Sequence, residues 1–186
     1  GPDCGAYIAE NVFDPPTQVT HWAPDGYKRN CDAAAFRAAY LDGKTHAPKA
    51  RAFYAAYYIH LLTDRAWVRD IVEPVRAASG TAFGTPEDIA LTLEQKKDWY
   101  GMDMQFLAEN PAFEPLQVLA GAGGFLNEYL PYYGPHALAA QMKNIVEYYR
   151  MGTTPQGRVY RWLTKQGMDA FICRNAREIR PLLHGL

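Results

Sequence analysis

The hydrophobic and polar positions of this chain follow a helical pattern over most of its length, and Pro and Gly residues divide that pattern into segments. Asp32 can cap the start of a helix that runs through Leu41. Pro48 suits the first turn of a long helix, whose pattern continues unbroken to about Val72, with Pro74 beyond it as a stop. The first part of the chain therefore predicts a short helix followed by a long one.

The strongest helix start in the chain is the stretch TPED at residues 85–88. Its Thr can cap the helix, its Pro fits the first helical position, and its two acidic residues favour the positive end of the helix dipole. We expect that helix to end at Asn110. The same signals predict three further pieces: 112–131 with an interruption at GAGG (121–124), Pro135 to Gly152, and Thr154–Pro155 to about Leu183 with a candidate break at Gly167.

The first 31 residues differ from the rest, because they are rich in Pro and show little periodicity. We expect a loop-rich arm with one short helix near Ala6–Val12. No stretch of the chain alternates between apolar and polar residues between turn signals, so no sheet is expected. The sequence predicts an all-α fold: a single-domain multi-helix bundle over residues 1–186, with a loop-rich N-terminal arm.

Composition narrows the possible partners. The chain has 186 residues and a net charge of −1, which gives no electrostatic reason to expect a nucleic acid or an anionic membrane surface. No apolar run reaches the roughly 18 residues that a transmembrane helix needs. No signal peptide is visible, which favours the cytoplasm, although the chain does not begin with Met and its native N-terminus is an open question. Oligomeric state cannot be read from the sequence.

The three cysteines, Cys4, Cys31 and Cys173, are an odd number and form no CxxC pair. A disulfide framework and a thiolate metal site are therefore not expected. Free cysteines are usually buried, so we expect buried thiols. Cys4 is the exception to watch, because it adjoins Asp3.

The stretch FYAAYYIHLLTDRAW at residues 53–67 carries the main chemical signal. His60 and Asp64 are four residues apart, so a helix places both on one face. A carboxylate among apolar residues needs a cation. The candidates are Arg65 or Arg69, the imidazole itself, or a metal ion. The simpler interpretation is a satisfied core histidine beside a salt-bridged aspartate.

Two residues of the arm extend this pair. Asp3 stands in a Pro-Asp turn in GPDC, and His21 lies in the irregular segment VTHWAP. Together with His60 and Asp64 they would form a set of two nitrogen and two oxygen ligands, which suits zinc, while nickel, iron and manganese stay possible. Such a site would also give the arm a reason to dock on the bundle.

The PD turn, the TH pair and the helix FYAAYYIHLLTDRAW resemble the zinc-dependent phospholipase C family of bacteria, which is related to the P1-type nucleases. The match is closest to a bacterial branch without assigned activity, and the segment DWYGMDMQFL at 98–107 is similar to a later helix of that branch. The resemblance covers roughly residues 1–107. It implies an all-α fold with catalytic zinc between helices, held here by Asp3, His21, His60 and Asp64.

The chain also departs from that family pattern. The family clusters several zinc ions, but its next histidine falls about where Asp70 stands, and His136 is followed by Ala140 where an H-x-x-x-E pair needs an acid. The helix that precedes the Pro-Asp turn in the family is missing. We therefore expect one zinc ion rather than a full cluster, with a two-metal site as the alternative, in which Asp70 would be a second ligand unless it pairs with Arg69.

Two functions are compatible with these residues. The first is a metal-dependent hydrolase that acts on a small-molecule or lipid-headgroup phosphoester, with a metal-activated water as nucleophile. In that case Asp64 and Asp103 are the candidate catalytic carboxylates. Asp103 would be a base for the metal-bound water, a ligand of a second metal or a carboxylate that supports a ligand, and a solvent-facing Asp103 is the simpler alternative. A nuclease-like activity stays open. The second function is a structural metal site in a non-catalytic binding or scaffold module. Four protein ligands would nearly fill the site, so a water would need a fifth position or a labile carboxylate.

Overall fold

The computed structural model describes residues 1–9, 12–153, 155 and 157–185. Most of this part of the chain is helical, so the predicted all-α fold is confirmed. The α-helices are α1 (Thr17–Thr20), α2 (Ala33–Tyr40), α3 (Pro48–Trp67), α4 (Glu73–Ser79), α5 (Pro86–Glu109), α6 (Glu114–Gly121), α7 (Ala137–Met151) and α8 (Lys165–Ile179). Shorter helical turns are η1 (Lys28–Asn30), η2 (Val68–Val72) and η3 (Arg180–Leu183).

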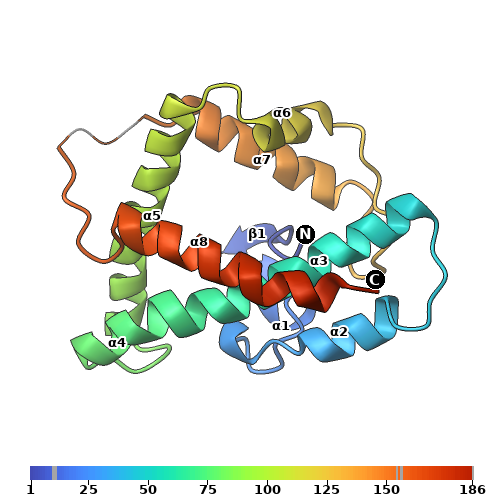
Figure 1. Cartoon of the computed structure of the whole chain (residues 1–186), viewed down its shortest axis with the longest axis horizontal. Helices are drawn as coiled ribbons and strands as arrows, with labels where there is room; N and C mark the ends of the chain where they lie inside the picture. The colour runs from blue at the N-terminus through green and yellow to red at the C-terminus, as the bar shows by residue number, and fades with distance from the viewer. Residues whose placement is uncertain (10–11, 154, 156, 186) are drawn as a thin grey trace.

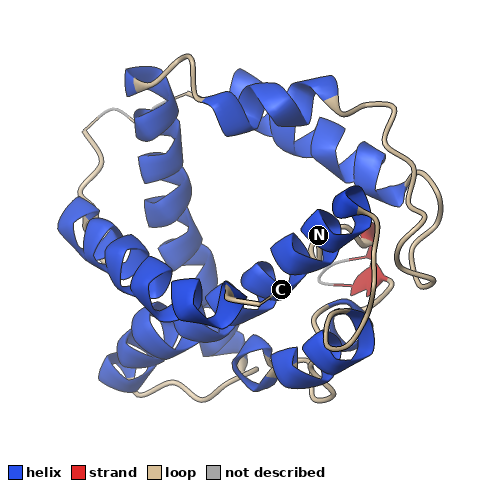
Figure 2. Cartoon of the chain, turned by 45° about the vertical axis from the view of Figure 1, so that its right-hand side comes forward, coloured by secondary structure: helices blue, strands red, loops and turns tan. Residues whose placement is uncertain are grey.

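The long helix α3 runs through the middle of the molecule, with α8 packed along it (Figure 1). The short helix α2 and the N-terminal arm pack against the other side of α3. On the far side of α8, α6 packs on α7, and α5 connects this pair to the lower helices (Figures 1 and 2). None of the described helices is both long enough and apolar enough to cross a bilayer.

Two of the predicted helix starts are made as expected. The side chain of Asp32 accepts a hydrogen bond from the backbone N–H of Ala35 at 2.8 Å, which caps α2. Thr85 accepts one from the N–H of Asp88 at 3.2 Å and caps α5, which ends before Asn110 as predicted. Both caps satisfy backbone donors that a helix start would otherwise leave unpaired.

The N-terminal arm contains a small antiparallel hairpin of β1 (Ala6–Ala9) and β2 (Val12–Asp14). These are the strands of the described part of the chain, and Figure 2 draws them in red. The predicted helix near Ala6–Val12 is therefore wrong, and so is the expectation that no sheet forms. A helix of this length is marginal in water. The hairpin instead pairs two aromatic side chains across its strands, with Tyr7 edge-on to Phe13 at a centroid distance of 5.7 Å.

Pro74 does not stop the long helix as predicted. The chain passes from α3 through the π-helical turn η2 directly into α4, and Pro74 sits in the first turn of α4. Pro74 has no N–H to donate to the preceding turn, and it follows directly on the π-helical turn η2, where the regular α-helical hydrogen-bond pattern is already interrupted. The helical path ends only at Gly80, whose φ of 67° is the left-handed conformation that glycine adopts readily.

The last helix also begins later than predicted. It starts at Lys165, after the cap residue Thr164, rather than at Thr154–Pro155, and Thr154 itself lies outside the described residues. Gly167 is not a break, because its N–H donates to the Thr164 side chain at 3.1 Å within the capped first turn. Residues 157–163, which precede this helix, are not helical. The side chain of Asp98 on α5 holds them by accepting hydrogen bonds from the Arg158 side chain and from the backbone N–H of Trp162.

The hydrophobic core next to the arm is rich in aromatic side chains from α2, α3 and the segment before α7. Phe36 and Tyr57 stack with ring centroids 4.7 Å apart, and neither is more than 2% exposed. Cys4 and Cys31 are buried in the same core as free thiols, as expected, whereas the expectation is wrong for Cys173, which is exposed. The arm is thus part of the core and not a peripheral tail.

Candidate metal centre

One face of α3 carries the chemistry, because residues three and four apart on a helix lie above one another. Tyr57, His60 and Asp64 follow this spacing along the helix. Tyr57 is fully buried, and its hydroxyl donates a hydrogen bond to the backbone carbonyl of Thr20 in the arm. His60 and Asp64 lie one and two turns further on, where the arm crosses the helix. The buried tyrosine therefore docks the arm beside the two polar residues.

Two contacts fix the arm residues that face this helix. The hydroxyl of Tyr133 donates to the backbone carbonyl of Pro2 at 2.7 Å, next to Asp3. The Thr20 hydroxyl lies 2.9 Å from Nδ1 of His21, which leaves Nε2 of that ring free to face α3. A hydroxyl can donate or accept, so Thr20 serves either tautomer of the imidazole. Both arm residues are thus oriented by groups of the core.

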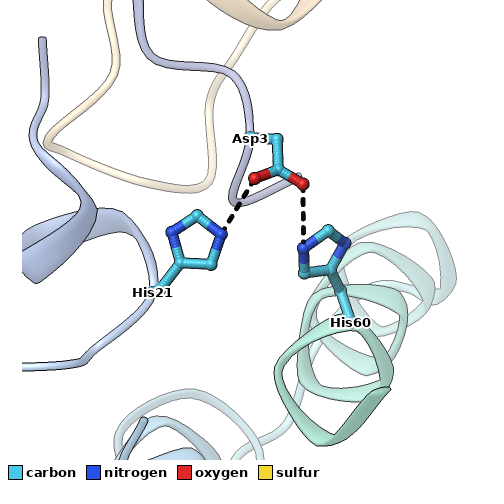
Figure 3. Close-up of side chains that lie close together, drawn as sticks. All are labelled: Asp3, His21 and His60. Atoms are coloured by element: carbon cyan, nitrogen blue, oxygen red, sulfur yellow. Dashed lines mark hydrogen bonds and ion pairs between the residues drawn. The ribbon is translucent and has the colours of Figure 1, made fainter. Parts of the chain in front are cut away.

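The side chains of Asp3, His21 and His60 meet at the surface between the arm and α3 (Figure 3). Nε2 of His21 lies 3.0 Å from Oδ1 of Asp3, and Nε2 of His60 lies 3.2 Å from Oδ2 of the same carboxylate. One ligand atom from each of the three residues can be chosen so that all lie within 4.8 Å of one another. His21 is 3% exposed and Asp3 is 54% exposed, so the cluster opens to solvent on one side.

Asp64 stands beside this group of three. Its Oδ2 atom lies 3.3 Å from Nε2 of His21 and 3.3 Å from Nε2 of His60. It falls outside the set whose ligand atoms all lie within 4.8 Å of one another. Asp64 therefore contacts both imidazoles, but it is a less central oxygen donor than Asp3.

Lys28, on the short turn η1, is a fifth member of the cluster. Its ammonium nitrogen lies 2.9 Å from Oδ1 of Asp3 and 3.0 Å from Oδ2 of Asp64. The cation that balances Asp64 is therefore Lys28 together with the imidazoles, and not Arg65 or Arg69, the arginines that the sequence offered. In the structure Arg69 pairs with Asp70 at 2.6 Å instead.

Burial and neighbouring charges shift the pKa of each group in the cluster. Burial lowers the pKa of His21 below its usual value, which keeps that imidazole neutral at pH 7. Burial acts in the same direction on His60, but contacts with Asp3 and Asp64 outweigh it and raise the pKa of His60 to about 9. Burial opposes ionisation of both carboxylates, yet the imidazoles and Lys28 hold the pKa values of Asp3 and Asp64 below their usual range.

The donor set fits a divalent metal ion by its chemistry and by its unpaired atoms. Two imidazole nitrogens and a carboxylate are common ligands of zinc. Nε2 of His60 and Oδ2 of Asp64 are buried and 3.3 Å apart, and they are held by charge, with Lys28 3.0 Å from the same oxygen, rather than by hydrogen bonds of good alignment. Buried polar atoms normally have partners, and here a metal ion in place of the ammonium would give both atoms a directional one. The structure thus brings together the four ligands that the sequence predicts, Asp3, His21, His60 and Asp64, with Asp64 at the edge of the cluster.

Asp103, the other predicted catalytic carboxylate, has no described contact with this cluster. It lies on α5 and accepts a hydrogen bond from the Tyr149 hydroxyl of α7 at 2.8 Å. It is partly buried and not solvent-facing, so the simpler expectation is also wrong in that respect. Burial raises the pKa of Asp103 above its ordinary value, and the Tyr149 hydrogen bond opposes that rise only partly.

This shift predicts how Asp103 affects stability. A carboxyl whose pKa is higher in the folded state than in the unfolded state binds more protons when folded. Its contribution to the free energy of unfolding therefore falls as the pH rises from the pKa of the unfolded state through the pKa of the folded state. Asp103→Asn removes this loss while keeping an acceptor for Tyr149. We expect the variant to melt above the wild type at pH 7 and level with it near pH 3. Equal destabilisation of the variant at both pH values would contradict a raised pKa of Asp103 in the folded protein.

The arm contact made by Tyr133 gives a second prediction. Tyr133→Phe removes the hydrogen bonds to the Pro2 and Gly1 carbonyls and should cost about 1 kcal/mol of unfolding free energy. Because Asp3 is the next residue, we also expect zinc affinity to fall about tenfold, as when a group that supports a metal ligand is removed. Calorimetric zinc titration measures this. Tyr100→Phe is the control, since Tyr100 is partly exposed and lies on α5. Unchanged zinc affinity in Tyr133→Phe would show that the arm holds its position without this contact.

Sequence reasoning missed Lys28, Thr20, Tyr57 and Tyr133. Thr20 could have been found, because it adjoins His21 and a metal-binding histidine usually has a partner for its second nitrogen. No signal marks the other three, since lysines and tyrosines are frequent in this chain.

The fold and the cluster define an all-α protein with two histidines and two aspartates gathered around a small surface site. No family model, no curated protein and no solved structure matches the chain, so the resemblance to the phospholipase C family rests on the sequence motifs alone.

Proposed function

We propose that this protein is a metal-dependent hydrolase of phosphoesters, with one zinc ion held by Asp3, His21 and His60. The observation that carries the proposal is the convergence of these three donors from the arm and from α3 within 4.8 Å of one another. Structural zinc sites usually have four protein ligands, whereas catalytic sites have three and leave a position open. The exposure of Asp3 also favours a site that a substrate can reach.

A zinc ion in such a site supplies a water of lowered pKa, near 7, and polarises a phosphoryl oxygen. The residues of the chain have separate roles around it. His21 is held by Thr20 and is neutral at pH 7, as a ligand must be, whereas His60, with a pKa of about 9, would release a proton when zinc binds. Asp64 lies beside both imidazoles and is ionised, because the imidazoles and Lys28 hold its pKa below the usual range, and it is the carboxylate that we assign to accept a proton. Asp103 stays a candidate base from sequence alone.

The test combines metal content with a chromogenic phosphodiester, bis(4-nitrophenyl) phosphate. We expect about one zinc per chain by mass spectrometry, activity that EDTA removes and zinc restores, and a loss of at least about 100-fold in kcat for Asp64→Asn. Asp169→Asn on α8 is the control, because that exposed aspartate only pairs with Lys165. If no stoichiometric metal binds and EDTA leaves the melting temperature unchanged, the hydrolase proposal falls.

The second candidate is a structural metal site in a binding or scaffold module. The observation in its favour is that the cluster joins the arm to α3 and so could pin one to the other. Bound zinc that raises the melting temperature, with no hydrolysis of any phosphoester, would favour this candidate.

A further inference from the structure

The strongest feature that the proposed function leaves unused is the ammonium group of Lys28. It lies between two carboxylates that are 61 positions apart in the sequence, 2.9 Å from Asp3 and 3.0 Å from Asp64. It donates a well-aligned hydrogen bond to Oδ1 of Asp3. That same oxygen faces Nε2 of His21. Lys28 is therefore bonded to the carboxylate that is central to the three-ligand set.

A divalent ion and this ammonium compete for the same carboxylate. Zinc binds a carboxylate oxygen at about 2.0–2.2 Å. An ammonium that stayed 2.9 Å from the same carboxylate would then face a doubly charged ion at close range, in a site from which water is partly excluded. Like charges at that separation repel strongly. Binding of one cation therefore disfavours the other.

Lys28 has a way to leave. It is carried by the short turn η1 at the surface, and about one third of its side chain is exposed. A lysine side chain is a flexible four-carbon stem, so its ammonium can move into solvent without any change of the backbone. His21 has no such freedom, because it is buried and held by Thr20.

We propose that Lys28 is the internal counter-ion of the cluster: it holds Asp3 and Asp64 together before a metal binds, and it competes with the metal for both carboxylates. This inference rests on the proposed metal site and adds a residue that sets its affinity. A lysine that only helped to assemble the site would have the opposite effect on metal binding, so a single substitution separates the two roles.

The decisive variant is Lys28→Met, which keeps most of the side-chain volume and removes the charge. Zinc affinity is measured by competition with a chromogenic chelator at pH 7 and fixed ionic strength. We expect Lys28→Met to bind zinc at least about tenfold more tightly than the wild type. Without metal it should melt at a lower temperature than the wild type, because two neighbouring carboxylates have lost their cation, and saturating zinc should recover the difference.

Two further variants control for charge and for folding. Lys44→Met removes a positive charge from an exposed lysine in the loop after α2 and should leave zinc affinity unchanged. Lys28→Arg keeps the charge and can still bridge two carboxylates, so it should bind zinc no more tightly than the wild type. Lys28→Gln replaces Lys28→Met if the latter does not fold without metal. If both neutral variants stay unfolded even with zinc, the proposal fails, since the metal should replace the ammonium.

The outcomes distinguish this inference from the proposed function. Zinc binding by the wild type with equal or weaker binding by Lys28→Met would overturn the role of Lys28 and leave the metal site standing. Binding by Lys28→Met alone would support the role of Lys28 and overturn the hydrolase proposal for the native chain. If neither protein binds zinc, both proposals are overturned.

Discussion

Replacing His60 by Ala should abolish stoichiometric zinc binding, with an affinity loss of at least about 100-fold, because it removes one of three converging ligands. His60 contributes the nitrogen that faces both Asp3 and Asp64, and no other described histidine reaches that position from α3. Its side chain is partly exposed, so we expect the fold to survive the substitution. Zinc content by mass spectrometry and zinc titration by calorimetry both measure the effect.

The matched control is His136→Ala. His136 is exposed, precedes α7 and has no described contact with the cluster, so its removal should leave zinc content and affinity unchanged. If His60→Ala keeps one zinc per chain at wild-type affinity, the three-ligand site is wrong. If both variants lose zinc equally, the metal binds exposed histidines without a defined site.

Replacing Asp98 by Ala should destabilise the protein by about 3 kcal/mol and lower its melting temperature by about 6–12 °C. Asp98 is completely buried on α5. Its carboxylate accepts hydrogen bonds from the Arg158 side chain at 3.0 Å and from the backbone N–H of Trp162 at 2.6 Å. The substitution leaves a guanidinium without its counter-charge and a backbone donor without its acceptor, and both losses are costly in a buried setting.

Asp169→Ala provides the comparison, because that aspartate pairs with Lys165 on the exposed side of α8. Exposed ion pairs of this kind contribute little, so we expect a change within about 0.5 kcal/mol. Thermal and urea unfolding of both variants measure the difference. A change in Asp98→Ala as small as that in Asp169→Ala would mean that the segment before α8 is not held by Asp98.

The fold was predictable where the signal is local. Helix starts at Asp32 and Thr85 depend on a side chain and a backbone N–H three residues apart, so the sequence contains both partners. The start of α8 was not predictable in this way. The polypeptide before it is held to α5 by Asp98, which lies 60 positions from Arg158. The hairpin in the arm was missed because its segment is short, and the pairing of its two strands decides its structure.

The candidate site divides in the same manner. The position of His60 and Asp64 on one face follows from helical spacing and needed no tertiary information. Asp3 and His21 were named from a Pro-Asp turn and an irregular His segment, with a family resemblance that implied the same residues, and the structure does bring them beside the helix pair. Lys28 was invisible, because nothing in its neighbourhood distinguishes it from other lysines of the chain.

The sequence by itself determined that the chain is helical and that one helix face presents an imidazole and a carboxylate together, since both follow from a repeat of 3.6 residues per turn. Only the tertiary structure decided which groups oppose them. The buried hydroxyls of Tyr57 and Tyr133 dock the arm, and the docked arm brings Asp3, His21 and Lys28 into contact with α3. The physical reason is that the partners of these charged side chains lie on segments distant in the sequence. Which segments pack together does not follow from any local sequence pattern.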